Sequence, residues 1–149
     1  EILREVGEAR PEVRHRIEGM AVEKLNHKVI EQATEHELQK FAALLEANPR
    51  SMKRFVNAYS VALSTELIAG RLPDPEVLAL WTILRMRWPE LADCLEKKPH
   101  MIAELDDDDG ETPDDLPETL HPLHGDAALV RLLKFGGRAL NEETLRQFS

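Results

Sequence analysis

The sequence predicts an all-α fold, an irregular helical bundle of about seven helices with one mobile acidic loop. Apolar residues recur every three or four positions, the spacing that aligns them on one face of a helix. No stretch between turn signals alternates apolar and polar residues, as a half-buried strand does. The chain has 149 residues, 42% of them hydrophobic, which is enough to bury one core, so we expect a single domain over residues 1–149.

A short leading helix is expected to end at Arg10-Pro11, and two further helices are expected before residue 48. The first is long and runs from about Pro11 to Gln32, after a break at Arg10-Pro11, because the residue before a proline avoids the helical region. Thr34 and Glu37 have the spacing of a capping box, in which each side chain binds the backbone N–H of the other residue. This pair indicates a second helix, which should end before Asn48.

Asn48 and Asp74 are predicted to start the two central helices. Each has a side-chain oxygen that can accept hydrogen bonds from the first turn, and each precedes a proline, which suits the first helical position. The first central helix should reach about Ala69, where Gly70 can adopt the left-handed conformation that ends many helices. Its packing side is predicted to hold Met52, Phe55, Val56 and Tyr59.

The second central helix has apolar residues on nearly every side, which predicts a buried position in the middle of the fold. It should end at Trp88, because Pro89 follows. A further helix is expected over residues 89–97, with Cys94 as a small core residue on its inward side. The apolar residues predicted for the central helix are Val77, Leu80, Trp81, Ile83, Leu84 and Trp88.

Residues 106–118 form the most acidic segment, with eight Asp or Glu residues and no Lys or Arg. The whole chain has a net charge of −9, so the remainder carries only −1. Two prolines and one glycine also lie in this segment, so we expect a disordered acidic loop over residues 105–120. Two short helices should follow, over residues 126–135 and 141–148, joined by Gly136-Gly137.

No catalytic or metal site is predicted. If Gly110 is placed at the invariant glycine of a calcium loop, Leu105 and Leu116 occupy positions that need acidic ligands. His121 and His124 have no second pair of ligands at a matching spacing.

The single cysteine fits a reducing compartment, and the densest apolar run is too short to span a bilayer, so we expect a cytoplasmic location.

The start of the first central helix carries the strongest functional signal. Its first turns hold three cations and no acid, and Arg50, Lys53, Arg54 and Asn57 share one helix face. Free backbone N–H groups and the positive end of the helix dipole also favour a negative group at such a start. The pattern predicts a contact with an anion or a phosphate. The alternative is a solvated face whose cations pair with Glu residues of a neighbouring helix.

Arg85 and Arg87 stand in an otherwise apolar helix, where a charge needs a partner or access to solvent. One interpretation pairs them with nearby acids such as Glu90 or Asp93. The other makes them, together with Asn57, a candidate interface with a ligand or an adjoining domain.

Two blocks carry a family resemblance: NPRSMKRFVNAYSVA, from residue 48, and LALWTILRMRWPELAD, from residue 78. They resemble the helical segment that follows the nucleotide-binding core in bacterial KAP-family P-loop NTPases. The resemblance runs from about Glu37 to Ser149 and is densest at residues 48–58 and 77–93. It implies a lid-like C-terminal region in which Arg50 senses the nucleotide phosphates, supported by Lys53 and Arg54. It also implies that ATP and Mg are bound by an N-terminal P-loop core of the parent protein.

The chain itself departs from the family pattern, because it has no GxxxxGK[ST] motif and none of its seven glycines precedes a lysine. We therefore expect no ATP hydrolysis by this chain alone. Its first residue is Glu, which suggests a piece of a longer protein.

The expected function is a lid that couples nucleotide state to a protein partner or to self-association in a homo-oligomer. The alternative is a non-catalytic helical protein–protein interaction module. Nucleic-acid binding is disfavoured, because three cations on one helix are a small footprint.

Overall fold

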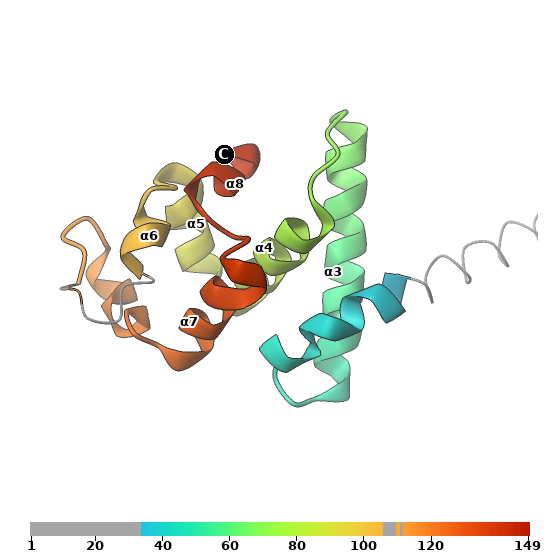
Figure 1. Cartoon of the computed structure of the whole chain (residues 1–149), viewed down its shortest axis with the longest axis horizontal. Helices are drawn as coiled ribbons and strands as arrows, with labels where there is room; N and C mark the ends of the chain where they lie inside the picture. The colour runs from blue at the N-terminus through green and yellow to red at the C-terminus, as the bar shows by residue number, and fades with distance from the viewer. Residues whose placement is uncertain (1–33, 106–109, 111) are drawn as a thin grey trace, which may run out of the picture. The chain divides into compact units, whose positions relative to one another are not determined.

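The computed structural model describes residues 34–105, 110 and 112–149 (Figure 1). Every regular element within these ranges is an α-helix or a 3-10 helix, so the predicted all-α fold class is confirmed. By its contacts the chain divides into two units, Glu1–Gln39 and Lys40–Ser149. The sites described below belong to the second unit.

The helix expected to end before Asn48 is present, as an α-helical stretch over residues 34–38 that continues into the 3-10 helix η1 (Gln39–Leu44). The short leading helix and the long helix predicted between Pro11 and Gln32 lie outside the described residues. A single domain over the whole chain stays a prediction. The later elements are α3 (Pro49–Ile68), α4 (Pro75–Arg87), α5 (Pro89–Lys97), α6 (Met101–Leu105), η2 (Glu118–Leu123), α7 (Ala127–Lys134), η3 (Phe135–Gly137), α8 (Glu142–Leu145) and η4 (Arg146–Phe148).

Helix α3 begins and ends at the residues that the sequence indicated. The backbone N–H of Arg50 donates to Oδ1 of Asn48 (2.9 Å), which is the expected N-cap. At the other end Gly70 has a φ of 74°, and the N–H groups of Gly70 and Arg71 donate back to the carbonyls of Leu67 (3.0 Å) and Glu66 (2.8 Å). This pair of bonds is a Schellman motif, which satisfies carbonyls that the helix leaves unpaired.

Helix α4 is the buried centre of the fold, as predicted. Oδ1 of Asp74 accepts from the N–H groups of Glu76 (2.9 Å) and Val77 (3.1 Å) and so fixes its first turn. All eight residues of the run 77–84 are buried, and the helix packs against α3 and α5. Trp81 belongs to this core, but Trp88 is only half-buried, so its assignment to the core was wrong. Trp88 stands at the corner between α4 and α5, directly before Pro89.

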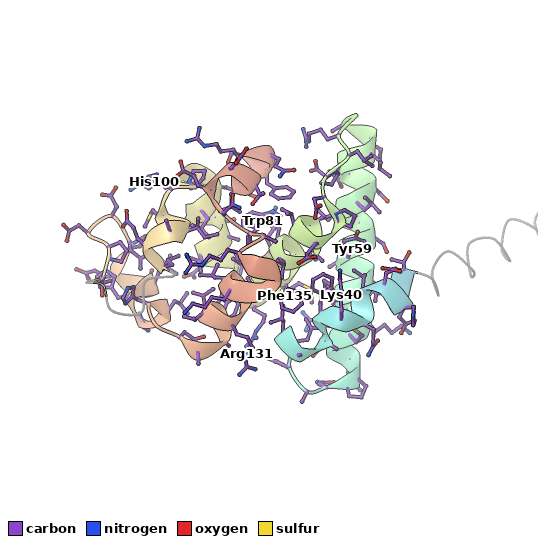
Figure 2. All side chains as sticks on the ribbon, viewed as in Figure 1. Lys40, Tyr59, Trp81, His100, Arg131 and Phe135 are labelled. Atoms are coloured by element: carbon purple, nitrogen blue, oxygen red, sulfur yellow. The ribbon has the colours of Figure 1, made fainter. Side chains whose placement is uncertain are left out.

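Aromatic side chains join the start of the second unit to the rest of the core. The ring of Phe41 lies 6.1 Å from that of Phe55 and 5.3 Å from that of Phe135, and Phe55 contacts Tyr59 edge-on at 6.4 Å. Figure 2 labels Tyr59 and Phe135 in this region. Fully buried leucines from α5 and α7 extend the same core, namely Leu91, Leu95, Leu129 and Leu132.

The predicted acidic loop is too wide at its C-terminal end. Leu116 and Leu120 are buried, η2 begins within the predicted loop, and Nζ of Lys98 lies 3.5 Å from Oδ2 of Asp115. Helix α6 was also missed, and Leu105 at its end is buried rather than part of a loop. The physical reason is that these spaced leucines anchor the chain to the core despite the surrounding acids. Residues 106–109 and 111 lie outside the described residues.

The last helices return the chain to α4. Three consecutive residues, Gly136, Gly137 and Arg138, have φ values of 61°, 67° and 68°, so the backbone makes a left-handed turn there. Asn141 and Thr144 then form a capping box that starts α8. The ring of Phe148, at the end of η4, stacks on that of Trp81 in α4, with centroids 5.5 Å apart and an interplanar angle of 10°. Both predicted C-terminal helices are confirmed, although α8 is only one turn long.

Candidate functional site

The three cations of the basic face, defined as Arg50, Lys53 and Arg54, are exposed on the first turns of α3. Within the described ranges none of them forms an ion pair or a side-chain hydrogen bond. The first turn also contains no acid. The alternative in which these cations pair with Glu residues of a neighbouring helix is therefore not seen in the described part of the chain.

Arg54 also faces a polar hollow of about 220 Å³ between the start of α3 and the end of α4. Arg87 reaches the same hollow from α4, where its Nη1 donates to the carbonyl of Leu44 (2.8 Å) and its guanidinium lies 4.6 Å from the centre of the Trp88 ring. The structure thus brings together two arginines that the sequence had treated as separate features. The residues lining the polar hollow are Leu45, Glu46, Ser51, Arg54, Met86, Arg87 and Trp88.

The predicted partners of the two α4 arginines were wrong. Nη1 of Arg85 pairs with Oε1 of Glu96 (3.0 Å), and the Arg85 guanidinium lies 6.0 Å from the centre of the Trp81 ring. Arg87 binds a backbone carbonyl instead of an acid. The predicted acids, Glu90 and Asp93, are exposed at the start and middle of α5, whereas Glu96 lies near its end and reaches back along α4.

A second hollow is larger and mostly apolar. It measures about 550 Å³ and lies between the C-terminal half of α3, the middle of α4 and the last turn of the chain. Asn57 and Arg85, two of the candidate interface residues, line it, whereas Arg87 does not. We call it the apolar groove. Its walls are formed by Asn57, Ala58, Val61, Ala62, Thr65, Glu66, Leu78, Trp81, Thr82, Arg85, Met86 and Phe148.

Large apolar side chains stay exposed along the same end of α3. Val61 is 67% exposed and lines the groove, and Ile68, two turns further on, is 88% exposed. Leu67 and Leu72 are exposed by 52% and 85%. Isolated apolar residues are common on protein surfaces, but several exposed apolar residues near one helix end, one of which lines an apolar groove, are typical of a contact surface.

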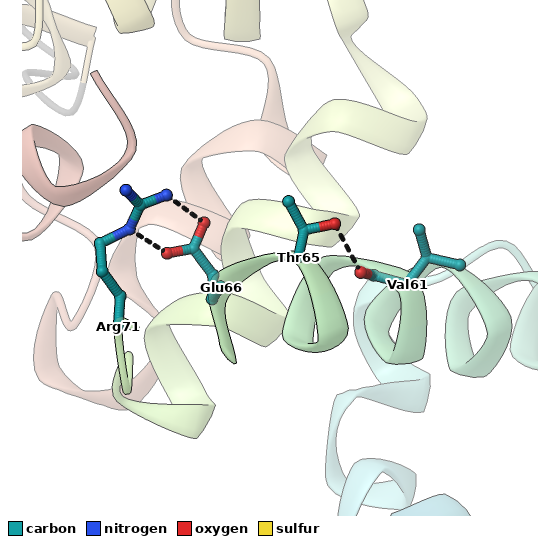
Figure 3. A network of polar contacts seen from close by, with 4 residues as sticks. All are labelled: Val61, Thr65, Glu66 and Arg71. Carbon is teal, nitrogen blue, oxygen red and sulfur yellow. Dashed lines mark hydrogen bonds and ion pairs between the residues drawn. The ribbon is translucent and has the colours of Figure 1, made fainter. Parts of the chain in front are cut away.

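Arg71 and Glu66 form a bidentate ion pair at the C-terminal end of α3 (Figure 3). Nε and Nη2 of Arg71 donate to the two carboxylate oxygens of Glu66, at 2.6 Å and 3.1 Å. Glu66 itself is buried, and the hydrogen bonds from Arg71, aided by its charge, outweigh burial and lower the pKa of the Glu66 carboxyl. In the same view the Thr65 hydroxyl donates to the carbonyl of Val61 (2.9 Å), so it is already bonded on the groove wall.

The described residues hold no group of three or more metal-ligating side chains. Nε2 of His121 bonds with the carbonyl of Leu116 (2.9 Å), and Nε2 of His124 is buried without a hydrogen-bond partner in the structure. Cys94 is half-buried, with its Sγ 3.8 Å from Sδ of Met101. No helix in the described ranges is long and apolar enough to cross a membrane.

The chain matches no family model, no curated protein and no solved structure. The KAP-family resemblance at residues 48–58 and 77–93 therefore stays a prediction. Sequence reasoning missed the apolar groove and the approach of Arg54 to Arg87. The one available sequence signal for the groove was Val61, an apolar residue that follows Asn57 by four positions and so continues the face predicted to be polar.

Proposed function

We propose that this chain is the C-terminal helical lid and sensor region of a bacterial, cytoplasmic KAP-type P-loop ATPase. Its N-terminal P-loop core would bind ATP and Mg, and this chain would contribute no Walker A motif. The observation that supports the proposal best is the unpaired basic face at the capped start of α3. A cation without an acidic partner keeps its full attraction for a phosphate.

Arg50 is the proposed phosphate sensor, because it stands in the first turn of α3, beside the positive end of the helix dipole. Lys53 and Arg54 follow on the next turn and add positive charge to the same face. A phosphate held there would fix the position of α3 relative to the core. Loss of the phosphate would release α3, and nucleotide state would thereby reach a protein partner or a second copy of the protein.

The test uses the full-length parent protein and the variant Arg50→Ala. One charge-assisted contact with a phosphate contributes roughly 1.5–3 kcal/mol, so ATP affinity or turnover should fall by about ten- to a hundred-fold. Thermal stability should stay unchanged, because the Arg50 side chain is exposed. Arg131→Ala, which removes an exposed arginine from α7, is the matched control. Unchanged ATP affinity and turnover in Arg50→Ala would contradict the sensor role.

The second candidate function is a non-catalytic helical interaction module, and the apolar groove favours it. Val61 is exposed in a groove that α4 and Phe148 complete, and Ile68 is exposed two turns further along α3. Burial of such side chains against a second protein surface would contribute a favourable hydrophobic term. Sedimentation velocity over a range of concentrations tests the self-association form of this function. Ile68→Asp should abolish any dimer while Arg50→Ala preserves it, and a concentration-independent monomer in the wild-type chain would contradict self-association.

A further inference from the structure

We propose that the polar hollow is an oxyanion-binding site for a phosphate or diphosphate group, with Arg54 and Arg87 as its two binding arms. This inference rests on the proposed function, because it names a second phosphate contact in the same sensor region. It goes further in assigning that contact to Arg87, a residue of another helix, and in placing the contact in a defined hollow of about 220 Å³.

Arg87 is held in position before any ligand arrives. One terminal nitrogen donates to the carbonyl of Leu44, and the planar guanidinium lies 4.6 Å from the centre of the Trp88 ring. A cation over an aromatic face is attracted by the ring electrons, and it loses little freedom when it then binds an anion. The guanidinium has several N–H groups in a fixed fork, so the bond to Leu44 leaves others for an oxyanion.

Arg54 and Ser51 contribute further hydrogen-bond donors to the lining of the hollow. Both residues belong to α3, and their side chains form no hydrogen bond or ion pair with another described residue. Other hydroxyls of the helix behave differently, because those of Ser60 and Ser64 donate to carbonyls one turn earlier. The two arginines, from two helices, therefore line one hollow together with an unbonded hydroxyl, and such a set of donors can bind the oxygens of a phosphate.

One acid lies in the wall of the hollow and opposes anion binding. Glu46 forms no ion pair with Arg54 or Arg87. The ionised side chains around the hollow are thus two cations and one anion, which leaves an excess of one positive charge. Removal of the Glu46 charge should therefore strengthen the binding of an oxyanion, whereas removal of either arginine should weaken it.

The experiment is titration calorimetry on the 149-residue chain, with inorganic pyrophosphate as one probe and ATP as the other. Arg54→Gln and Arg87→Gln should each weaken pyrophosphate binding by about ten-fold. Glu46→Gln should strengthen it, and Arg131→Gln should leave it unchanged, because Arg131 does not line the hollow. Arg87→Lys keeps the charge but loses the planar fork, so it should also weaken binding. Thermal unfolding of each variant shows whether it is folded.

No binding of either probe by the wild-type chain would overturn the inference, and so would an equal loss in Arg131→Gln and Arg87→Gln. Tighter binding of ATP than of pyrophosphate would identify the nucleotide as the source of the phosphate, whereas equal affinity would identify a free diphosphate site. The proposed function can fail separately. In that case pyrophosphate binds the hollow with the expected mutational pattern, but Arg50→Ala leaves the ATP affinity and turnover of the parent unchanged.

Discussion

Helices α3 and α4 start in the same way but differ in burial. Each begins with a side-chain cap followed by a proline, at Asn48-Pro49 and Asp74-Pro75. In α4 the residues from Val77 to Leu84 are buried on every side. In α3 the buried residues are few, while the basic face at one end and the apolar residues at the other reach the surface. The difference separates two tasks: α4 holds the fold together, and α3 presents the surfaces that can bind.

The largest expected effect tests that separation with one chemical change in each helix. Leu80 is fully buried in α4, and Leu67 is 52% exposed in α3. Leu80→Ala should lower the free energy of unfolding by about 2–5 kcal/mol, because truncation of the buried side chain creates a cavity in the core. Leu67→Ala should change it by less than about 0.5 kcal/mol. Denaturant unfolding of both variants makes the comparison, and equal losses would show that burial does not distinguish the two helices.

The caps provide the next test. Asp74 accepts two backbone N–H groups, whereas Asn48 accepts one. Replacement of an N-cap by alanine costs roughly 0.5–2 kcal/mol, so Asp74→Ala should fall in the upper part of this range and Asn48→Ala in the lower part. The measurement is again the free energy of unfolding. A larger loss in Asn48→Ala would mean that α3 contributes more to stability than its exposure indicates.

A pH-dependent prediction concerns the end of α3. The pKa of Glu66 lies below its ordinary value of 4.5, chiefly because Arg71 donates hydrogen bonds to the carboxylate. The ionised form is therefore favoured in the fold, and this contribution is complete above pH 4.5 and lost as the pH falls through the lower folded value. Because Arg71 is exposed to solvent, which screens its charge, the contribution should be small.

Glu66→Gln should remove this part of the acid destabilisation, as measured by thermal unfolding from neutral to acidic pH. The control is Glu143→Gln on the exposed side of α8. If the two variants have the same pH profile as the wild type, the ion pair does not stabilise the folded chain.

The smallest effect is measured first on the wild-type chain. Tyr59 is the single tyrosine, and burial against the core, aided by the charge of Asp74, raises its pKa above the ordinary value of 10.0. Folding thus disfavours tyrosinate, and stability should decline as the pH rises above 10.0. Ultraviolet titration should show a higher midpoint in the native chain than in denaturant. Asp74→Ala should lower the native midpoint only in part, since burial is the larger cause; coincident native and denatured midpoints would contradict a buried Tyr59.

Local signals in the sequence were sufficient for the main helices. Asn48 and Asp74 cap through bonds to their own next residues, and the apolar residues around α4 indicate burial without any knowledge of what covers them. The contacts between distant segments were not predictable in this way. Arg87 binds the carbonyl of Leu44. Arg85 pairs with Glu96, although Glu90 and Asp93 are closer to it in the sequence. Such partners depend on how helices cross, and residue spacing within one helix does not contain that information.

The extent of the acidic loop was overestimated for a related reason. Composition averages over a segment, whereas Leu116 and Leu120 each need only one apolar site on the core to be fixed. The candidate site shows the same limit. The sequence identified the basic residues of α3, but it could not show that Arg54 shares a hollow with Arg87.

The positions of the two tryptophans have a practical consequence. Trp81 forms part of the wall of the apolar groove, under the ring of Phe148, and Trp88 forms part of the wall of the polar hollow, beside the guanidinium of Arg87. The chain has no other tryptophan. Each candidate binding surface therefore contains its own intrinsic fluorophore. In Trp81→Phe the remaining emission reports on the hollow, in Trp88→Phe it reports on the groove, and occupancy of the two surfaces can be followed separately without an added dye.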